Sequence, residues 1–363
     1  MSSVWTNNLK ISIFGESHGK AIGAVIDNLP YGEKIDLDDI AFQMERRAPG
    51  RNSFSSERGE KDQVHIISGT KNGITTGAPL CVLIENKNAD SSSYLNFRDI
   101  PRPGTADFSS SIKYKNFNDL SGSGHLSGRL TAALTACGKI CQQILQHRGI
   151  SIAAHVYSVG EIYDRSFLEN VLSTEKTLNE LLTQKEIPMI DMSKKEKVKE
   201  EILSYKQRGD SIGGCIECAV LGLGAGIGEP IFYGVENVIS SLVFAVPGVK
   251  GIDFGAGFDV CKMSGSENND NFIFSQGKIK TETNNHGGVL GGISTSMPII
   301  FKVAMKPTPS IKLPQTTLNV ATEETVELKV TGRHDPCIVP RAVPVIEAVA
   351  AIAILDLLIG RQR

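Results

Sequence analysis

Apolar residues recur at two periods along this chain, and together they predict a protein of the α+β class. Short apolar runs bounded by glycine, proline or polar residues favour strands. Such runs cover residues 9–14, 21–26, 63–68, 79–84, 152–159, 214–221 and 299–303. Apolar residues spaced three and four apart, with charged faces between them, predict helices at 37–46, 130–148, 193–206 and 346–359. Because strands and helices do not alternate regularly, a doubly wound parallel sheet is not expected.

Two of the predicted helices differ sharply in polarity. Much of the surface of 130–146 is Ala, Thr and Cys, as in a helix buried between layers. Segment 165–208 instead carries a dense run of lysines and glutamates, which predicts a solvated helix at the surface; a partner-binding face is the alternative.

Composition narrows the function classes. The 363 residues are 40% hydrophobic and 21% charged, enough for a large core, and the net charge of -2 argues against a nucleic-acid binder. Seven cysteines without regular spacing suit a reducing cytosol, and Cys215 and Cys218 lie in a predicted buried strand. Glu347 and Asp356 interrupt the longest apolar run, and the first ten residues hold no signal sequence. We expect a soluble cytoplasmic protein that binds neither nucleic acid nor membrane.

Charged residues and prolines crowd the segment ahead of the last predicted helix. Arg333, His334, Asp335 and Arg341 fall within nine positions, and three prolines stiffen residues 332–347. Proline fixes φ and removes a donor, so we expect a rigid loop there rather than a helix or a central strand. The sequence favours a functional site over a solvated surface loop because a second polar cluster lies near the other end of the chain.

That second cluster contains a histidine between glycines. Gly15-Glu16-Ser17-His18-Gly19 follows a predicted strand, and the glycines allow a sharp turn that brings polar groups to a ligand. His18 can change protonation near neutral pH, which suits a general acid; the alternative is a turn histidine bonded to backbone.

Arginines predict an anion site. Guanidinium groups grip carboxylate or phosphate through paired hydrogen bonds, and Arg46, Arg47, Arg51 and Arg58 lie within thirteen residues. The glycine-rich loop 122–128 opens a helix, where free N–H groups favour an anion such as phosphate, and Arg129 follows it. It is not a Walker motif, because no lysine follows the glycines in the required order.

The order of short motifs along the chain resembles the chorismate synthase family. The motifs include Gly15-Glu16-Ser17-His18-Gly19, Arg47-Ala48-Pro49-Gly50, Arg102-Pro103-Gly104, Gly291-Gly292-Ile293-Ser294, Lys306-Pro307-Thr308 and Gly332-Arg333-His334-Asp335-Pro336-Cys337. The resemblance implies one domain over 1–363, a β-α-β sandwich with helices packed between antiparallel sheets, and a homotetramer. It also implies anti-1,4-elimination of phosphate and a proton from 5-enolpyruvylshikimate-3-phosphate (EPSP), giving chorismate, with reduced FMN and no net redox change.

The same resemblance assigns the site residues. It implies that His18 protonates the departing phosphate and that Asp335 works with the flavin in taking up the ring proton. Substrate or NADP contacts map to Arg47, Arg51, Arg129 and Arg341. FMN contacts map to His125, Leu126, Ser127, Pro247, Gly248, Gly291, Lys306, Pro307, Thr308, Pro309, Ser310 and Arg333. No metal site is expected, and because no reductase domain is visible, an external flavin reductase is the expected source of electrons.

Three departures from the family pattern leave alternatives open. Ser53 stands where the family often has arginine, with Arg51 two residues away, so which arginine grips the substrate stays open. Thr105 stands where the family usually has a second histidine, and His125 stands where an arginine is common, so we hypothesise that His125 supplies charge near the flavin. The Thr105 substitution motivates an alternative, a flavin- and anion-binding homologue with lost or altered turnover. A third interpretation is a metal-dependent hydrolase built on His18, His334 and Asp335, although no HExxH-like pair is present.

Overall fold

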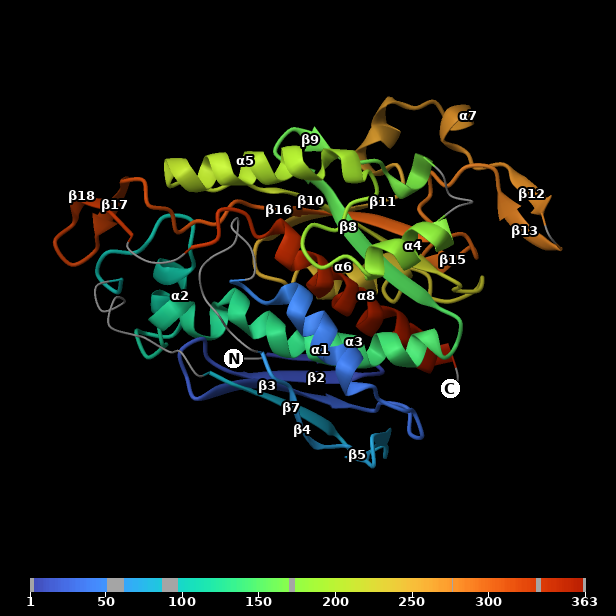
Figure 1. Cartoon of the computed structure of the whole chain (residues 1–363), viewed down its shortest axis with the longest axis horizontal. Helices are drawn as coiled ribbons and strands as arrows, with labels where there is room; N and C mark the ends of the chain where they lie inside the picture. The colour runs from blue at the N-terminus through green and yellow to red at the C-terminus, as the bar shows by residue number, and fades with distance from the viewer. Residues whose placement is uncertain are drawn as a thin grey trace.

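Two five-stranded antiparallel sheets enclose a layer of helices in the computed structural model, which describes residues 3–50, 62–86, 97–169, 174–275, 277–330 and 334–361. Figure 1 shows one sheet below the helix layer and the other above it. This arrangement confirms the α+β class and the β-α-β sandwich.

The first sheet is built from the N-terminal part of the chain. Its strands, in spatial order, are β1 (Val4–Thr6), β2 (Lys10–Gly15), β3 (Ala21–Asp27), β7 (Leu80–Glu85) and β4 (His65–Ser68). Alternate residues of β3 and β7, such as Ile22 and Val82, are fully buried against the helices. One face of this sheet therefore forms half of the core, as the period of two predicts.

The second sheet comes from the rest of the chain. Its order is β11 (Val249–Phe254), β16 (Ile299–Met305), β10 (Gly214–Leu221), β8 (Ser151–Val159) and β9 (Ile162–Tyr163). Its central strands are buried on both faces, because α4 (Thr174–Leu182) covers the face turned away from the helix layer. The predicted strand that holds Cys215 and Cys218 is confirmed as β10.

Four helices fill the layer between the sheets: α1 (Leu37–Arg47), α3 (Thr131–Gln146), α6 (Val235–Val243) and α8 (Val339–Arg361). Every residue from Thr131 to Leu145 is buried, which confirms the predicted interior helix. Its small side chains permit close packing: a methyl group added at Gly138 would lie 2.4 Å from Cβ of Ala348. Helix α8 is long and apolar enough to cross a membrane, but 94% of its most apolar window is buried inside the protein.

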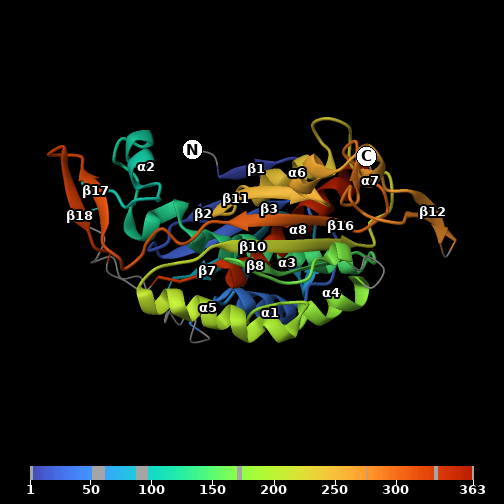
Figure 2. The ribbon, with the colours of Figure 1, turned by 90° about the horizontal axis from the view of Figure 1, so that it is seen from above.

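Smaller elements lie around this sandwich. The helices are α2 (Asp107–Lys113), α5 (Lys195–Arg208) and α7 (Gly265–Asn268). The two-stranded sheets are β5 (Thr70–Lys71) with β6 (Ile74–Thr75), β12 (Phe272–Ser275) with β13 (Lys278–Thr281), β14 (Val289–Leu290) with β15 (Ile293–Ser294), and β17 (Gln315–Asn319) with β18 (Glu324–Leu328). Figure 2 shows β12 and β17–β18 projecting at opposite ends of the molecule.

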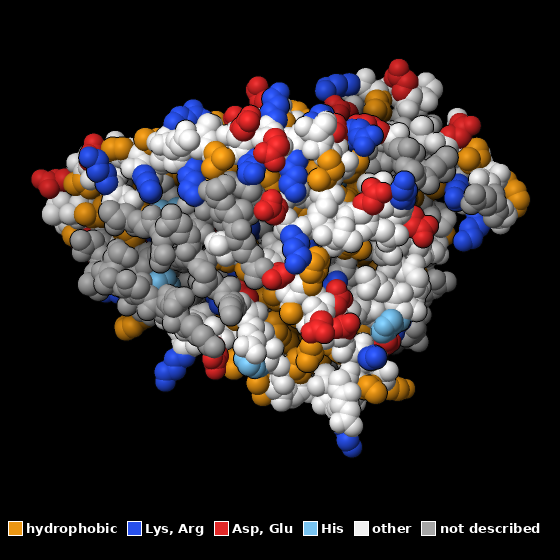
Figure 3. All heavy atoms as spheres, in the orientation of Figure 1, with side chains coloured by type: hydrophobic (Ala, Val, Ile, Leu, Met, Phe, Trp, Pro, Cys, Tyr) orange, Lys and Arg blue, Asp and Glu red, His pale blue; other side chains and the backbone are white. Residues whose placement is uncertain are grey.

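Helix α5 matches the surface helix predicted at 193–206. Only Val198 and Ile202 of this helix are buried. Acidic and basic side chains are interspersed over α5 along the upper edge of the molecule in Figure 3. The predicted position of this charged run at the protein surface is therefore confirmed.

The prediction of a loop throughout 332–347 is wrong, because α8 begins at Val339. Pro340 falls in the first helical turn, where a backbone N–H has no partner within the helix and proline is tolerated. Pro344 lies inside the helix, and its carbonyl accepts a hydrogen bond from Gln43 Nε2 at 3.3 Å. The described non-helical part of this segment is therefore 334–338.

A buried charged cluster connects β8 and β10 of the second sheet to the segment that follows β9. His155 of β8 is fully buried; its Nδ1 lies 3.0 Å from Asp164 Oδ2, and its Nε2 lies 3.0 Å from Glu217 Oε2. Glu217 also accepts from the Ser166 hydroxyl and the Phe167 N–H, at 2.6 and 2.7 Å. Burial lowers the pKa of His155, but its hydrogen bonds to the two carboxylates outweigh that effect and raise the pKa above the ordinary value.

Candidate active site

A cavity of about 460 Å³ opens at one end of the helix layer. It is bordered by the C-terminus of α1, the N-termini of α2, α3 and α8, the turn 246–248, and the segment 305–310 that leaves β16. Among the described residues that line it, five are cationic: Arg47, Arg102, Arg129, Lys306 and Arg341. Asp107 and Asp335 are the lining carboxylates in the same set, so the described wall carries excess positive charge.

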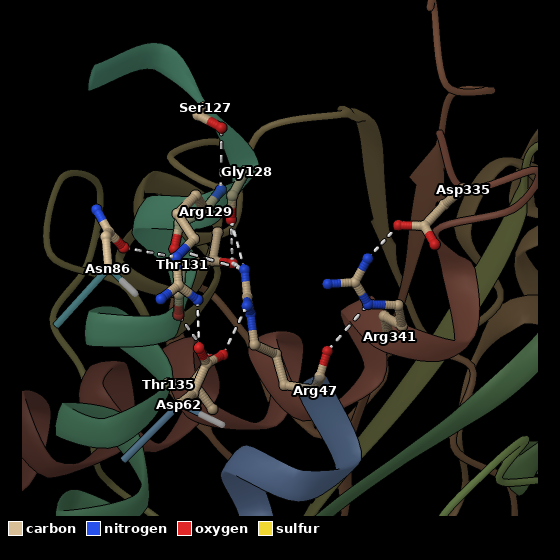
Figure 4. A network of polar contacts seen from close by, with 10 residues as sticks. All are labelled: Arg47, Asp62, Asn86, Ser127, Gly128, Arg129, Thr131, Thr135, Asp335 and Arg341. Carbon is tan, nitrogen blue, oxygen red and sulfur yellow. Dashed lines mark hydrogen bonds and ion pairs between the residues drawn. The ribbon is translucent and has the colours of Figure 1, made fainter. Parts of the chain in front are cut away.

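Two of the predicted anion-binding arginines share one buried carboxylate. Asp62 Oδ2 accepts from Arg47 Nη1 at 3.0 Å, and Asp62 Oδ1 accepts from Arg129 Nη1. Arg47 Nη2 also donates to the Gly128 carbonyl at 2.9 Å and to the Thr131 hydroxyl at 3.2 Å. Figure 4 shows the two guanidinium groups reaching the same carboxylate, Arg47 from α1 and Arg129 from the turn before α3.

The third arginine is paired with the aspartate that the resemblance assigns to proton uptake. Arg341 Nη1 of α8 donates to Asp335 Oδ2, and Arg341 Nε donates to the Arg47 carbonyl at 3.0 Å. In Figure 4 this pair lies across from the Asp62 group, with Arg47 between them. Asp335, Arg341, Arg47 and Arg129 are thus joined in one network through Asp62 and the Arg47 carbonyl.

A second ion pair lies at the start of α2. Arg102 is buried and bonds Asp107 through Nε and Nη2, at 2.7 and 2.8 Å, while Phe97 packs against its guanidinium. Thr105 lines the cavity, but its hydroxyl donates to the Arg102 carbonyl at 2.9 Å and accepts from the Asp107 N–H at 3.3 Å. The Thr105 hydroxyl therefore stabilises the local turn. Unlike the histidine that the family usually has at this position, it offers no group that titrates near neutral pH.

His18 lies behind the glycine-rich loop that borders the cavity. A side chain at Gly122 would meet the His18 ring at 2.6 Å and Ser17 Oγ at 2.9 Å, so the close approach requires glycine. Gly122, Ser123 and Gly124 all have positive φ, and this sharp turn carries Gly122 and Ser123 to the cavity wall. Ser17 also lines the wall and accepts from the Ser127 hydroxyl at 3.3 Å.

Most of the predicted FMN contacts line the cavity. They are Leu126, Ser127, Pro247, Gly248, Lys306, Pro307, Thr308, Pro309 and Ser310. His125 is not among the described lining residues: Nδ1 lies 2.7 Å from the Gly15 carbonyl and Nε2 lies 2.5 Å from Ser3 Oγ. Gly291 lies in the turn between β14 and β15, away from this lining. Arg51 and Arg333 lie outside the described residues.

The lining fits a flat heterocycle that carries a phosphate. The hydroxyls of Ser127, Thr308 and Ser310 and the amine of Lys306 supply donors, and Thr308 Oγ1 is buried with no hydrogen-bond partner in the described part of the chain. Leu126, Val246, Met305, Ile338 and Val345 supply an apolar wall. A Cβ added at Gly128 would meet nothing within 4 Å, so open space adjoins this backbone. A mostly apolar pocket with a few convergent donors is typical of cofactor sites.

The two aspartates that pair with the arginines of the cavity, Asp62 and Asp107, were not assigned to the site from the sequence. Asp62 lies in a polar stretch where a carboxylate is expected to be solvated, yet its side chain is fully buried. Charge balance is the sequence signal that could have identified these aspartates. Several arginines that converge on one cavity need carboxylate partners when they are buried.

The fold and this cavity define a class of protein: a β-α-β sandwich with an arginine-lined cavity at one end of its helix layer. The family described as chorismate synthase matches residues 9–359. Curated proteins named chorismate synthase from Pyrococcus abyssi and Methanocaldococcus jannaschii are 43% and 42% identical to the chain; the matches cover 98% and 99% of this chain and 97% of each relative. A solved structure titled "Crystal Structure of Chorismate Synthase" superimposes with a TM-score of 0.78 at 28% identity, over 98% of this chain and 93% of that one. The chain belongs to the chorismate synthase family.

Proposed function

We propose that this protein converts EPSP to chorismate by anti-1,4-elimination of phosphate and a proton, with reduced FMN and no net redox change. The observation that carries the proposal is the convergence of Arg47, Arg129 and Arg341 on one cavity. EPSP bears two carboxylates and a phosphate, and guanidinium groups are suited to hold such an anion in one orientation. Family membership favours this lyase activity over a homologue without turnover and over a metal-dependent hydrolase.

The chain's own residues divide the reaction between them. Arg47, Arg129 and Arg341 bind the anionic groups of the substrate and orient them for the reaction. We assign to His18 the proton that the departing phosphate takes up, because its ring lies close to Gly122, a residue of the cavity lining. Asp335 accepts the ring proton once an anion of the substrate competes for Arg341, which now neutralises it.

The cofactor has a matching set of holders. Leu126, Met305 and Ile338 would contact the flavin ring, while Lys306, Thr308 and Ser310 would donate hydrogen bonds to its polar groups. Reduced flavin supplies electron density when it is bound, and this chemistry belongs to the cofactor rather than to a side chain. We assign NADP, or substrate, to the arginine side of the cavity and propose an external flavin reductase as the source of electrons.

We further propose that the protein works as a cytoplasmic homotetramer. The hairpin β12–β13 supports self-association, since Phe272, Phe274 and Ile279 are 70%, 78% and 64% exposed. Figure 1 shows this hairpin extending from the body of the molecule. Exposed apolar side chains on a projecting element favour burial against another surface. Light scattering coupled to size exclusion tests the proposal, and a monomer at micromolar concentration would contradict it.

A single assay tests the reaction. Purified protein with photoreduced FMN and EPSP, kept anaerobic, is expected to form chorismate, followed by its absorbance, and to release phosphate in equal amount. Oxidised FMN is the control and is expected to give no product. Bound FMN without chorismate would instead favour the homologue that lost turnover.

A further inference from the structure

Asp62 lies behind the cavity wall and reaches the cavity through two arginines. Its side chain is fully buried, and it is not among the described lining residues, whereas Arg47 and Arg129 both are. Each carboxylate oxygen accepts from a different guanidinium: Oδ2 from Arg47 at 3.0 Å and Oδ1 from Arg129. One carboxylate therefore fixes the relative position of two cations from separate elements.

Burial strengthens the electrostatic interactions within this group. The side chains of Arg47 and Arg129 are 5% and 9% exposed, so the two like charges repel each other with little screening by water. A shared carboxylate offsets that repulsion. The hydrogen bonds from Arg47 Nη2 to the Gly128 carbonyl and from Arg129 Nε to Asn86 Oδ1 orient the outer edges of the pair.

We propose that Asp62 is a positioning residue that holds Arg47 and Arg129 as one preset anion-binding pair and sets their combined charge. Asp62 makes no contact with the substrate itself; its effect passes through the two guanidinium groups. The proposal rests on the proposed function for the identity of the substrate, EPSP.

The substitution Asp62→Asn separates this role from simple packing. Asparagine has nearly the same size but offers one acceptor oxygen, so its amide N–H₂ faces one of the two arginine donors. One guanidinium must then leave its position. We expect the KM for EPSP to rise about tenfold while kcat changes less than threefold, because the lost interaction serves binding rather than the chemical step.

A double-mutant cycle shows whether the effect passes through the arginines. If it does, Asp62→Asn adds less than threefold to the KM of Arg129→Lys, whereas independent effects multiply. The matched control is Asp356→Asn, a buried aspartate that bonds the Leu9 N–H at the far end of α8. It is expected to leave the KM within twofold of the unsubstituted protein while lowering Tm.

Asp62→Glu keeps the charge but displaces it by one methylene, so a KM about threefold above wild type is expected. This variant carries the test if Asp62→Asn does not fold. A second readout is titration of the flavin-free proteins with inorganic phosphate by calorimetry, where Asp62→Asn is expected to bind at least fivefold more weakly. Wild-type protein that binds phosphate but forms no chorismate would reject the proposed function and leave this titration as the test of Asp62. Unchanged KM and phosphate affinity in a folded Asp62 variant, or multiplicative effects in the cycle, would overturn the inference.

Discussion

Replacing His155 by leucine tests the buried charge cluster of the second sheet. Leucine keeps much of the ring's volume but removes the cation between Asp164 and Glu217. Breaking a buried ion pair costs about 3–5 kcal/mol, because the remaining charge loses its partner. Both carboxylates retain other donors, Asp164 from the Ile190 and Asp191 N–H groups and Glu217 from Ser166 and Phe167. We therefore expect His155→Leu to lower the free energy of unfolding by about 3 kcal/mol, near the lower end of this range.

The pH dependence of that loss distinguishes a charged histidine from a neutral one. The pKa of His155 is raised in the folded protein, so its stabilisation is full below the unfolded value near 6.5 and fades as the pH rises through the folded pKa. The pKa of Asp164 is lowered: burial raises it, but the hydrogen bond and charge of His155 outweigh burial. Its contribution is full above the unfolded value near 3.8 and fades as the pH falls through the folded pKa. The gap between wild type and His155→Leu should therefore be widest near pH 6 and narrow towards pH 9.

Urea unfolding followed by circular dichroism at pH 6.0, 7.5 and 9.0 measures the gap. The control is His147→Leu, which removes a half-exposed histidine beside Glu33 and is expected to cost under 1 kcal/mol. A His155→Leu loss under 1 kcal/mol, or a loss that does not change between pH 6.0 and 9.0, would refute the argument that a buried imidazolium holds this cluster.

Three further substitutions test other parts of the molecule. Asp335→Asn is expected to keep FMN binding but to lose about 100-fold in turnover, since it removes the carboxylate that we propose as proton acceptor and keeps its size; turnover within a few-fold of wild type would reject that role. His125→Ala is expected to leave FMN affinity within twofold and to lower Tm by a few degrees, because the ring bonds Gly15 and Ser3; a large loss of FMN affinity in a flavin titration would restore the hypothesis that it supplies charge there. Gly138→Ala is expected to destabilise the protein by about 2 kcal/mol through overpacking; Ala348→Gly in the same chain should recover most of this in urea titrations, and no recovery would contradict the packing argument.

The helices and strands of the core were the part of the fold that the sequence predicted best. The helix predicted at 37–46 is found as Leu37–Arg47, and the strand predicted at 214–221 is found at Gly214–Leu221. Both have strong periodicity and clear flanking polar residues. The hairpins β12–β13 and β17–β18 were not predicted, since their exposed faces mix apolar and charged residues without a buried side to reveal the period.

The sequence could identify the cationic residues around the cavity but not the carboxylates that pair with them. Arg47 and Arg129 were proposed from the residues, since an arginine cluster at a Pro-Gly bend and an arginine after a glycine-rich loop suit anion binding, whereas Arg341 was assigned through the family resemblance. Asp62 could not be proposed in either way, because its pairing with both Arg47 and Arg129 depends on how α1 packs beside the start of α3. His155 was missed for a similar reason: its two carboxylates come from a following turn and a neighbouring strand.

The position of α8 in chain order also constrains how this protein can be made. Strands of both sheets and helix α3 precede Val339, so a ribosome completes them before it begins the helix that packs between them. Until α8 emerges, the apolar faces of the sheets and of α3 that pack against it stay exposed. Exposed apolar faces of this kind favour aggregation. The core between the two sheets is therefore completed only when the last part of the chain has been made.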